Sequence, residues 1–304
     1  MTSDEKPSSL WSFGYGSNMD VIALEKKKHV KVLDHTPAIL KDFNLTFGTP
    51  GMPWVEPAYA SISPAKGSEV HGVAFLMTQE SLDELNRTEL GYNQAEVTLK
   101  AYDGRDLAGF VYAPKNGWPD KDLLPSSRYL GVLIKGANQA GLEKEYIKRL
   151  ESHPTYSPPD WLIQLRKLRP NPEELPPITV DELAQHASQE NGLWVGCLGY
   201  VVKLNKSQWA LGAHRGRDVT TRTLMQFHGI PLDDNDDKGR PPYPLVTDLN
   251  PNELEYVTRW LDFYQVGKST DGTDNLGEII GYIPDFLAQQ KSGKTAFQLP
   301  PIPS

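Results

Sequence analysis

The segment Phe13-Gly14-Tyr15-Gly16-Ser17-Asn18-Met19 carries the residues of this chain best suited to chemistry. Residues 10–15 alternate as a strand does, so a glycine-rich turn follows the strand and leads into a short helix over residues 19–27. Such a turn can aim successive backbone N–H groups into one cavity, which suits a carboxylate or carbonyl oxygen. An ordinary tight turn is the alternative. The segment lacks the Gly-Lys-Ser/Thr ending of a phosphate-binding loop and the full dinucleotide fingerprint.

Other polar clusters are less informative. His214-Arg215-Gly216-Arg217-Asp218, with Arg222, could reach an anionic group or could be a loop held by salt bridges. The acidic residues 233–237 do not follow the EF-hand order and predict a solvated turn. The seven histidines never stand at the spacing of a helical metal site, and Cys197 is the single cysteine. We therefore expect no metal site.

Hydrophobic spacing predicts the elements that position these residues. Strands are expected over residues 38–47, 70–77 and 193–204, and a hairpin joins residues 96–102 to 107–112 around Asp103-Gly104. Thr78 is a suitable N-cap for a helix that carries Leu82 and Leu85. Further helices are expected over residues 127–135, 142–150, 161–169, 220–227 and 252–264. Proline-rich stretches at residues 152–159 and 170–177 indicate a boundary in the middle of the chain.

Composition limits the class of protein. The 304 residues carry a formal net charge of −8 and fit one large domain or two modest ones. A single cysteine excludes an internal disulfide framework and favours a reducing compartment, so a cytoplasmic location is expected. The first residues lack the apolar region of a secretory signal, and the most apolar stretch, residues 193–202, is too short to span a bilayer. The acidic balance argues against nucleic acid as a partner.

Several segments together resemble one family. Tyr15-Gly16-Ser17-Asn18-Met19 is similar to the Tyr-Gly-Ser-Asn-Leu/Met signature of the γ-glutamyl cyclotransferase-like (AIG2-like) superfamily. Four later segments resemble that family in the expected order, namely residues 38–47, 70–76 and 82–85, and Pro125-Ser126-Ser127-Arg128-Tyr129 with the glycines of the following helix pair. The resemblance covers residues 11–150, about half of the chain.

The resemblance implies an α+β fold, a small mixed β-barrel with flanking helices. In this chain the barrel would carry a C-terminal α/β extension packed on it. We expect a catalytic domain over residues 10–155, an extension over residues 156–290 that shapes the pocket, and tails at residues 1–9 and 291–304.

The same resemblance implies the site residues. The family's general acid/base glutamate falls on Glu89, ahead of Gly91-Tyr92, and Glu84 is the alternative, although it stands inside the predicted helix and more naturally faces solvent. The expected substrate-binding residues are Tyr15, Gly16, Ser17, Asn18, Met19 and Tyr129. A plain core position is the alternative for Tyr129, and Arg128 is expected at the surface or rim.

The chemistry of a γ-glutamyl amide explains this residue set. The α-amine of the substrate can close a five-membered ring on the γ-carbonyl, so the reaction requires no enzyme nucleophile and no cofactor. A partly buried glutamate with a raised pKa can take a proton from the amine and later return one to the leaving nitrogen. N–H groups aimed at the developing oxyanion would stabilise it. The expected products are 5-oxoproline and a free amine.

Later segments suggest a substrate. Residues 152–156 and 244–249 resemble the fungal cyclotransferases associated with gliotoxin-type epidithiodiketopiperazine pathways, which implies a glutathione adduct of a secondary metabolite as the small-molecule substrate. A cyclotransferase acting on free glutathione or on γ-glutamylamines is an alternative. A second alternative is a non-catalytic AIG2-like binding module.

Overall fold

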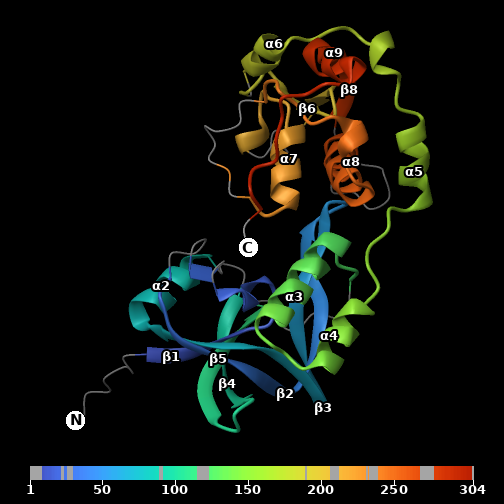
Figure 1. Ribbon diagram of the computed structural model, residues 1–304. Coiled ribbons are helices and arrows are strands. Elements are labelled where there is room, and N and C mark those ends of the chain that lie inside the picture. Colours follow the sequence, from blue (N-terminus) through green and yellow to red (C-terminus); the bar gives the residue numbers. More distant parts are fainter. Residues whose placement is uncertain are drawn as a thin grey trace. The chain divides into compact units, whose positions relative to one another are not determined.

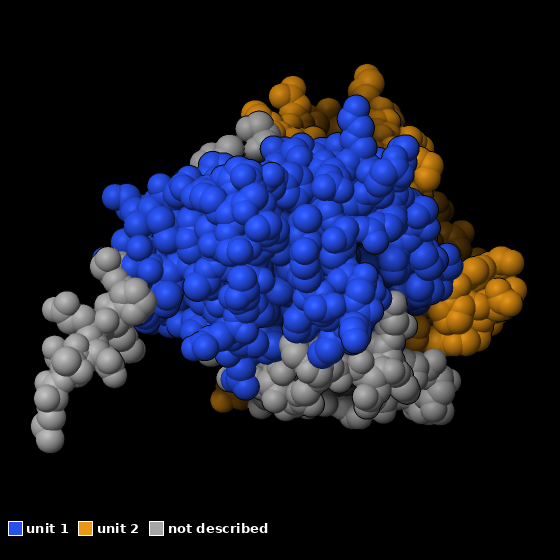
Figure 2. Space-filling view, turned by 90° about the horizontal axis from the view of Figure 1, so that it is seen from below, with its two compact units in different colours: residues 1–51, 56–157 blue, residues 52–55, 158–304 orange. Residues whose placement is uncertain are grey.

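A computed structural model describes residues 9–21, 24–25, 30–88, 92–114, 123–188, 190–205, 212–230, 232, 239–267 and 277–302 (Figure 1). The chain divides into two compact units, coloured separately in Figure 2. Unit 1 comprises Met1–Gly51 and Glu56–Ser157, and unit 2 comprises Met52–Val55 and Pro158–Ser304. Whether residues 156–290 pack on the barrel and shape its pocket stays a prediction.

Unit 1 is built around a closed five-stranded barrel in the order β1-β3-β2-β4-β5. Its strands are β1 (Ser9–Gly14), β2 (Val32–Met52), β3 (Glu56–Thr78), β4 (Tyr92–Ala101) and β5 (Asp106–Pro114). β1 is antiparallel to β3 and parallel to β5, which makes the barrel mixed. The predicted α+β fold with a small mixed barrel is confirmed.

The predicted hairpin is present between β4 and β5, where Lys100 pairs with Asp106. Gly104, in the turn, has φ +94° and so adopts a conformation that L side chains rarely take.

Three helices of unit 1 flank the barrel (Figure 1): α2 (Gln79–Thr88), α3 (Ser127–Gln139) and α4 (Lys144–Glu151). Leu82 and Leu85 of α2 are buried, as their helical spacing predicted. The interior of the unit is filled by large apolar side chains from strands and helices alike, among them Phe13, Phe47, Phe75, Met77, Leu99 and Leu133. This packing makes the interior of the barrel a solid core.

Unit 2 contains the three-stranded antiparallel sheet β6 (Leu193–Cys197), β7 (Tyr200–Leu204) and β8 (Gly277–Tyr282), in that order. Its α-helices are α5 (Asp160–Lys167), α6 (Val180–Gln185), α7 (Thr220–Phe227), α8 (Pro251–Val266) and α9 (Pro284–Ser292). Asn250 and Glu253 form a capping box at the start of α8. Trp54, from the short segment that belongs to this unit, donates its indole N–H to the carbonyl of Gly267 at 2.6 Å.

The structure corrects one predicted element. Residues 193–204 form two strands, β6 and β7, and not the single strand that we expected. Leu198 and Gly199 have φ angles of 52° and 77°, so the chain turns sharply between Cys197 and Tyr200, which pair across the turn. A leucine seldom adopts positive φ, and its apolar side chain continues the hydrophobic run, so the sequence pattern conceals the turn.

Candidate active site

The turn after β1 is tightly closed. Residues Ser17–Met19 form the 3-10 helix η1, in which the N–H of Met19 donates to the carbonyl of Gly16 at 3.1 Å. A Cβ atom on Gly14 would lie 2.9 Å from the carbonyl oxygen of Asn18, so the chain can fold back on the end of β1 only where a glycine stands. The side chain of Met19 is buried, and its Cβ would lie 3.1 Å from a Cβ on Gly136 of α3. The turn is therefore anchored both to β1 and to α3.

Tyr15 connects this turn to the end of α2. Its buried hydroxyl donates to the carbonyl of Tyr112 at 3.2 Å. The hydroxyl of Tyr112 donates in turn to Oδ1 of Asn86 at 2.8 Å, and Nε2 of Gln94 donates to the same oxygen at 3.0 Å. Asn86 lies in the last turn of α2, three residues before Glu89 in the sequence. Glu89 itself lies outside the described residues.

The alternative acid, Glu84, is in the described part of α2. Its side chain is 38% exposed and forms an ion pair with Arg87, whose side chain is 74% exposed. A carboxylate in that setting is a solvated surface charge paired with a surface arginine. The placement of Glu84 therefore favours Glu89 as the candidate acid.

Tyr129 lies at the start of α3 and reaches the turn that carries Gly16. Its hydroxyl oxygen accepts the N–H of Ala60 at 3.2 Å, and a Cβ on Gly16 would lie only 3.4 Å from that oxygen. The side chain is 7% exposed, and burial raises the pKa of Tyr129 well above 10. The phenol therefore stays neutral, and within the described residues its own proton has no hydrogen-bond acceptor. Tyr129 is thus a buried hydrogen-bond donor beside the glycine-rich turn.

A buried carboxylate that the sequence analysis missed fixes the start of α3. Glu56 is 5% exposed, and its Oε1 accepts Nη1–H of Arg128 at 2.8 Å while its Oε2 accepts the hydroxyl of Ser126. The side chain of Arg128, which we expected at the surface or rim, is 19% exposed. One signal in the sequence pointed to Glu56, because it is the only acidic residue between Asp42 and Glu69.

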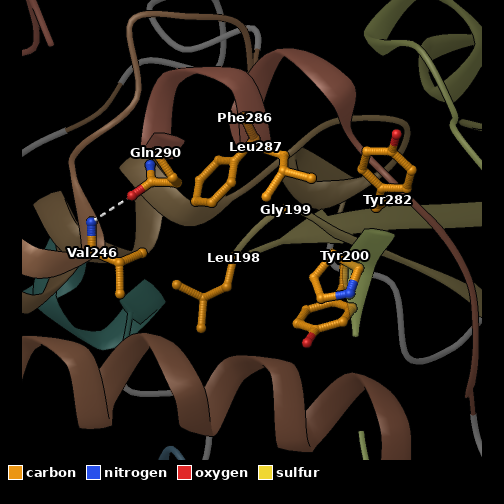
Figure 3. Close-up of a pocket in the computed structure, with 9 residues that line it drawn as sticks. Leu198, Gly199, Tyr200, Val246, Tyr282, Phe286, Leu287 and Gln290 are labelled. Carbon is orange, nitrogen blue, oxygen red and sulfur yellow. Dashed lines mark hydrogen bonds between the residues drawn. The ribbon is translucent and has the colours of Figure 1, made fainter. Parts of the chain in front are cut away.

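Unit 2 has a cavity of about 300 Å³ (Figure 3), but its chemistry differs. The lining is mainly apolar and includes Pro172, Leu198, Gly199, Tyr200, Val246, Tyr282, Phe286, Leu287 and Gln290. Gln290 accepts the N–H of Val246 at 2.8 Å, the dashed line in Figure 3, and donates to the carbonyl of Pro244 at 3.0 Å. None of these lining residues carries a carboxylate, an imidazole or a thiol, so the phenols of Tyr200 and Tyr282 are the only lining groups that could transfer a proton.

The predicted cluster around His214 lies in the interior of unit 2. The imidazole of His214 is buried and hydrogen-bonds through Nδ1 to the hydroxyl of Tyr264. Burial, with Arg222 and Arg217 nearby, lowers the pKa of His214 to about 3. Asp218 is also buried and accepts the N–H of Thr220 at 2.9 Å. Of the two interpretations, the structure favours a loop tied by internal contacts.

The described residues contain neither a candidate metal site nor a helix that could cross a membrane. No group of three or more His, Cys, Asp or Glu side chains in the described ranges is placed to hold a metal ion. No helix in that part of the chain is both long and apolar enough to cross a bilayer.

Comparison with known proteins gives the family to which this barrel belongs. The model of the AIG2-like family matches residues 69–150. The γ-glutamyl cyclotransferase gliK of Claviceps purpurea is 30% identical over 156 residues, which are 47% of this chain and 70% of that protein. The γ-glutamylcyclotransferase of Bos taurus is 32% identical over 150 residues, 46% of this chain and 76% of that protein.

The chain belongs to the γ-glutamyl cyclotransferase family, within the AIG2-like group. The gliK protein of Aspergillus fumigatus is 29% identical over 177 residues, which span 64% of its length and 49% of this chain. The matched region is thus about half of the chain. γ-Glutamyl cyclotransferase activity is the enzymatic activity that this membership supports.

Proposed function

We propose that this protein is a γ-glutamyl cyclotransferase that releases 5-oxoproline from a γ-glutamyl amide, with its reaction centre between the Tyr15–Met19 turn, Tyr129 and Glu89. The observation that carries the proposal is the close approach of Gly16 to the Tyr129 hydroxyl, whose proton has no acceptor among the described residues. The relatives named above are γ-glutamyl cyclotransferases, which supports the proposal.

In the proposed reaction, the α-amine nitrogen of the substrate attacks its own γ-carbonyl carbon. A C–N bond forms in the five-membered ring, and the C–N bond to the leaving amine breaks. Glu89 takes the proton from the attacking amine and delivers a proton to the leaving nitrogen, so it is unchanged after one turnover. The reaction is intramolecular, so the enzyme gains rate by holding the amine against the carbonyl.

Two groups are assigned to substrate binding. The Tyr129 hydroxyl donates to an oxygen of the γ-glutamyl group, and if that oxygen is the one that becomes charged, the bond strengthens in the transition state. Backbone groups of the turn at Tyr15, Gly16, Ser17 and Asn18 contact the glutamyl moiety, while the N–H of Met19 is already bonded to Gly16. Met19 then contributes by packing the turn onto α3.

Two features of the residues on either side of Glu89 support its assignment as the acid. It follows α2 directly in the sequence, and Asn86 in the last turn of that helix is linked through Tyr112 to Tyr15 of the substrate turn. Tyr92, three residues after Glu89, contributes electrostatically to the raised pKa of Tyr129, after burial as the main cause. The residues on both sides of Glu89 are therefore coupled to the proposed site.

For the substrate, we propose a glutathione adduct of fungal secondary metabolism. The similarity to the fungal gliK proteins supports this choice. Because the chain is also similar to the bovine γ-glutamylcyclotransferase, free glutathione and γ-glutamylamines are the alternative substrates. The test is 5-oxoproline release from three substrates: glutathione, a γ-glutamylamine and a bulky glutathione S-conjugate. The proposal predicts the highest kcat/KM for the conjugate. Preference for free glutathione would contradict the substrate assignment but not the activity.

A matched pair of substrates tests the activity itself. γ-Glutamyl-alanine can cyclise by attack of its α-amine on the γ-carbonyl, whereas α-glutamyl-alanine presents its amide at the wrong carbon. The proposal predicts 5-oxoproline from the first compound only. Absence of 5-oxoproline from every γ-glutamyl compound would instead support a binding module.

A further inference from the structure

Glu56 has a role in the structure that the family motif does not assign. It is the first residue of β3, its carboxylate is buried, and both of its oxygens are engaged by the start of α3. We infer that Glu56 is a positioning residue that places the Tyr129 hydroxyl for substrate. This inference rests on the proposed function.

Two hydrogen bonds link the tyrosine backbone to the carboxylate, and in both the donor lies on the tyrosine side. The hydroxyl of Ser126 donates to Oε2 of Glu56, which leaves the Ser126 oxygen to accept the N–H of Tyr129 at 2.9 Å. Ser126 is the N-cap of α3, and its acceptor role satisfies one of the backbone donors at the helix start. Because Glu56 takes the Ser126 proton, it fixes the rotamer in which the cap oxygen faces Tyr129.

The other carboxylate oxygen holds the same turn of helix from a second side. Nη1 of Arg128 lies 2.8 Å from Oε1 of Glu56, and the Glu56 side chain is 6% exposed. The N-cap Ser126 and two residues of the first turn of α3, Arg128 and Tyr129, are thus fixed directly or through one hydroxyl by a single side chain. An ion pair with little solvent access resists reorientation, since separating the charges would leave each uncompensated.

Tyr129 is then attached to the same strand twice. Its backbone is bound through Ser126 to Glu56, and its hydroxyl is bound to the N–H of Ala60, four residues further along β3. The tyrosine side chain has only two rotatable torsions, so fixing both ends leaves its hydroxyl little freedom beside Gly16. The fixed hydroxyl is the one to which we assign the substrate.

A carboxylate serves this purpose better than a neutral side chain of the same shape. It accepts from Ser126 and Arg128 together, whereas the amide of a glutamine would turn its N–H₂ group toward one of the two donors. Glu56 also lies close enough to Tyr129 and Tyr59 to contribute, after burial, to the raised pKa of each phenol. The charge therefore helps to keep the Tyr129 hydroxyl protonated and able to donate.

The strand provides a matched control. Glu69 also lies on β3, is 43% exposed at its side chain, and contacts the imidazole of His71 at 3.1 Å. Among the described residues Glu69 forms no hydrogen bond or ion pair with α3, so Glu69→Gln removes a carboxylate from the same strand and leaves the helix start intact.

The test is a double-mutant cycle with Glu56→Gln and Tyr129→Phe, measured as kcat and KM for γ-glutamyl-alanine. Misplacement of a binding group by about 1 Å can cost on the order of 100-fold in rate. We expect Glu56→Gln to lower kcat by about 10- to 100-fold with KM within about threefold, because the hydroxyl acts mainly in the transition state. In the Tyr129→Phe background the same change should cost less than about threefold, since the group that it positions is gone.

Equal losses in both backgrounds would overturn the inference, because Glu56 would then act independently of Tyr129. So would a loss in Glu56→Gln that the Glu69→Gln control shares. Should Glu56→Gln fold poorly, Arg128→Gln keeps the cycle testable, with the same non-additivity expected against Tyr129→Phe.

A crystal structure of Glu56→Gln separates this inference from the proposed function. If the wild-type protein turns over no γ-glutamyl compound, the function fails, but the structure still tests the positioning. We expect the Tyr129 hydroxyl to move away from the N–H of Ala60, to which it is now bonded at 3.2 Å. An unmoved hydroxyl would contradict the inference whatever the activity.

Discussion

Both units bury a carboxylate against arginines, and they use it differently. In unit 2, Asp262 of α8 is fully buried and forms two ion pairs. Its Oδ2 lies 2.6 Å from Nη2 of Arg166 in α5, and its Oδ1 lies 2.5 Å from Nη2 of Arg169. In unit 1, Glu56 forms an ion pair with Arg128 and accepts a hydrogen bond from Ser126. The Ser126 oxygen accepts the N–H of Tyr129, whose hydroxyl proton has no acceptor within the described residues. In the network of unit 2, arginine N–H groups occupy both oxygens of the carboxylate. The network of unit 1 ends at the Tyr129 hydroxyl, a donor beside Gly16.

The difference separates stability from function. A buried charge pair with every oxygen satisfied ties one helix to another and leaves nothing for a ligand. Glu255 extends the closed network of unit 2, where burial would raise its pKa but hydrogen bonds from Arg166 and Arg259 outweigh burial and lower it. A network that stops at a buried hydroxyl whose proton has no acceptor among the described residues leaves that donor to be satisfied by substrate. The comparison predicts that variants of the two networks fail in different assays.

The largest effect is expected from Glu89→Gln, which removes the proposed proton carrier. The amide cannot take up the proton of the attacking amine, so kcat should fall by about 10³-fold or more, in the range of general acid–base catalysis. The measurement is 5-oxoproline release from γ-glutamyl-alanine at neutral pH.

The control for this change is Glu84→Gln on the exposed surface of α2, which should retain the activity of the wild type. Full turnover by Glu89→Gln would exclude the proposed mechanism. A similar loss of activity in Glu84→Gln would instead favour Glu84 as the general acid/base.

Asp262→Ala tests the closed network. Removing the carboxylate leaves the guanidinium groups of Arg166 and Arg169 partly buried without a counter-charge, so the free energy of unfolding should fall by about 3–5 kcal/mol. Urea unfolding followed by circular dichroism measures this loss. Asp248→Ala, at an exposed position of η5 (Val246–Asp248), is the matched control and should change it by less than about 0.5 kcal/mol. If Asp262→Ala unfolded like the control, the network would not be the stabilising feature of unit 2.

His214→Gln tests the interior of the same unit through pH. The folded imidazole has its pKa lowered to about 3, from 6.5 in the absence of the fold, so it stays neutral while the unfolded chain takes up a proton below about pH 6.5. The free energy of unfolding should therefore fall as the pH decreases from about 6.5 toward 3, by roughly 3 kcal/mol at pH 4.5. Glutamine does not titrate, so the variant should lose that part of the pH dependence.

Thermal unfolding at pH 7.5 and 4.5 measures the difference between His214→Gln and the wild type. His35→Gln, which changes an exposed histidine on β2, should keep the full pH dependence of the wild type. An unchanged pH dependence in His214→Gln would mean that this imidazole is not held neutral by the fold.

The smallest of these effects is expected from Tyr129→Phe, which removes the hydroxyl at the end of the unit 1 network. One hydrogen bond to a charged or charging oxygen corresponds to about 1.5–3 kcal/mol, or about 10- to 100-fold in kcat/KM. Tyr146→Phe, which changes another buried tyrosine of unit 1 on α4, serves as the control and should leave kcat/KM unchanged. Equal effects of the two variants would remove the special role given to the Tyr129 hydroxyl.

Local signals in the sequence were sufficient for much of unit 1. The alternation before Gly14, the Asp103-Gly104 turn and the spacing of Leu82 and Leu85 each predicted an element that the structure contains. These features depend on near neighbours in the chain, and the residues there have side chains that favour the observed conformation.

Contacts between distant residues could not be predicted in the same way. Glu56 and Ser126 are 70 positions apart, so their hydrogen bond depends on how the barrel and α3 meet. In unit 2 the turn at Leu198 has a residue type that rarely takes positive φ, and no strand or helix was predicted where β8 and α9 stand. The assignment of Tyr15–Met19 and Tyr129 to the site depends on the resemblance to the family. The structure adds that Gly16 and the Tyr129 hydroxyl lie close together.

The most direct test of the account is a crystal structure of the protein with 5-oxoproline bound. The account predicts that the product contacts the backbone of the Tyr15–Met19 turn and places an oxygen within about 3 Å of the Tyr129 hydroxyl, in hydrogen-bonding range. Product bound instead in the apolar cavity of unit 2 beside Leu198 and Phe286, with the Tyr15–Met19 turn and Tyr129 left untouched, would contradict it.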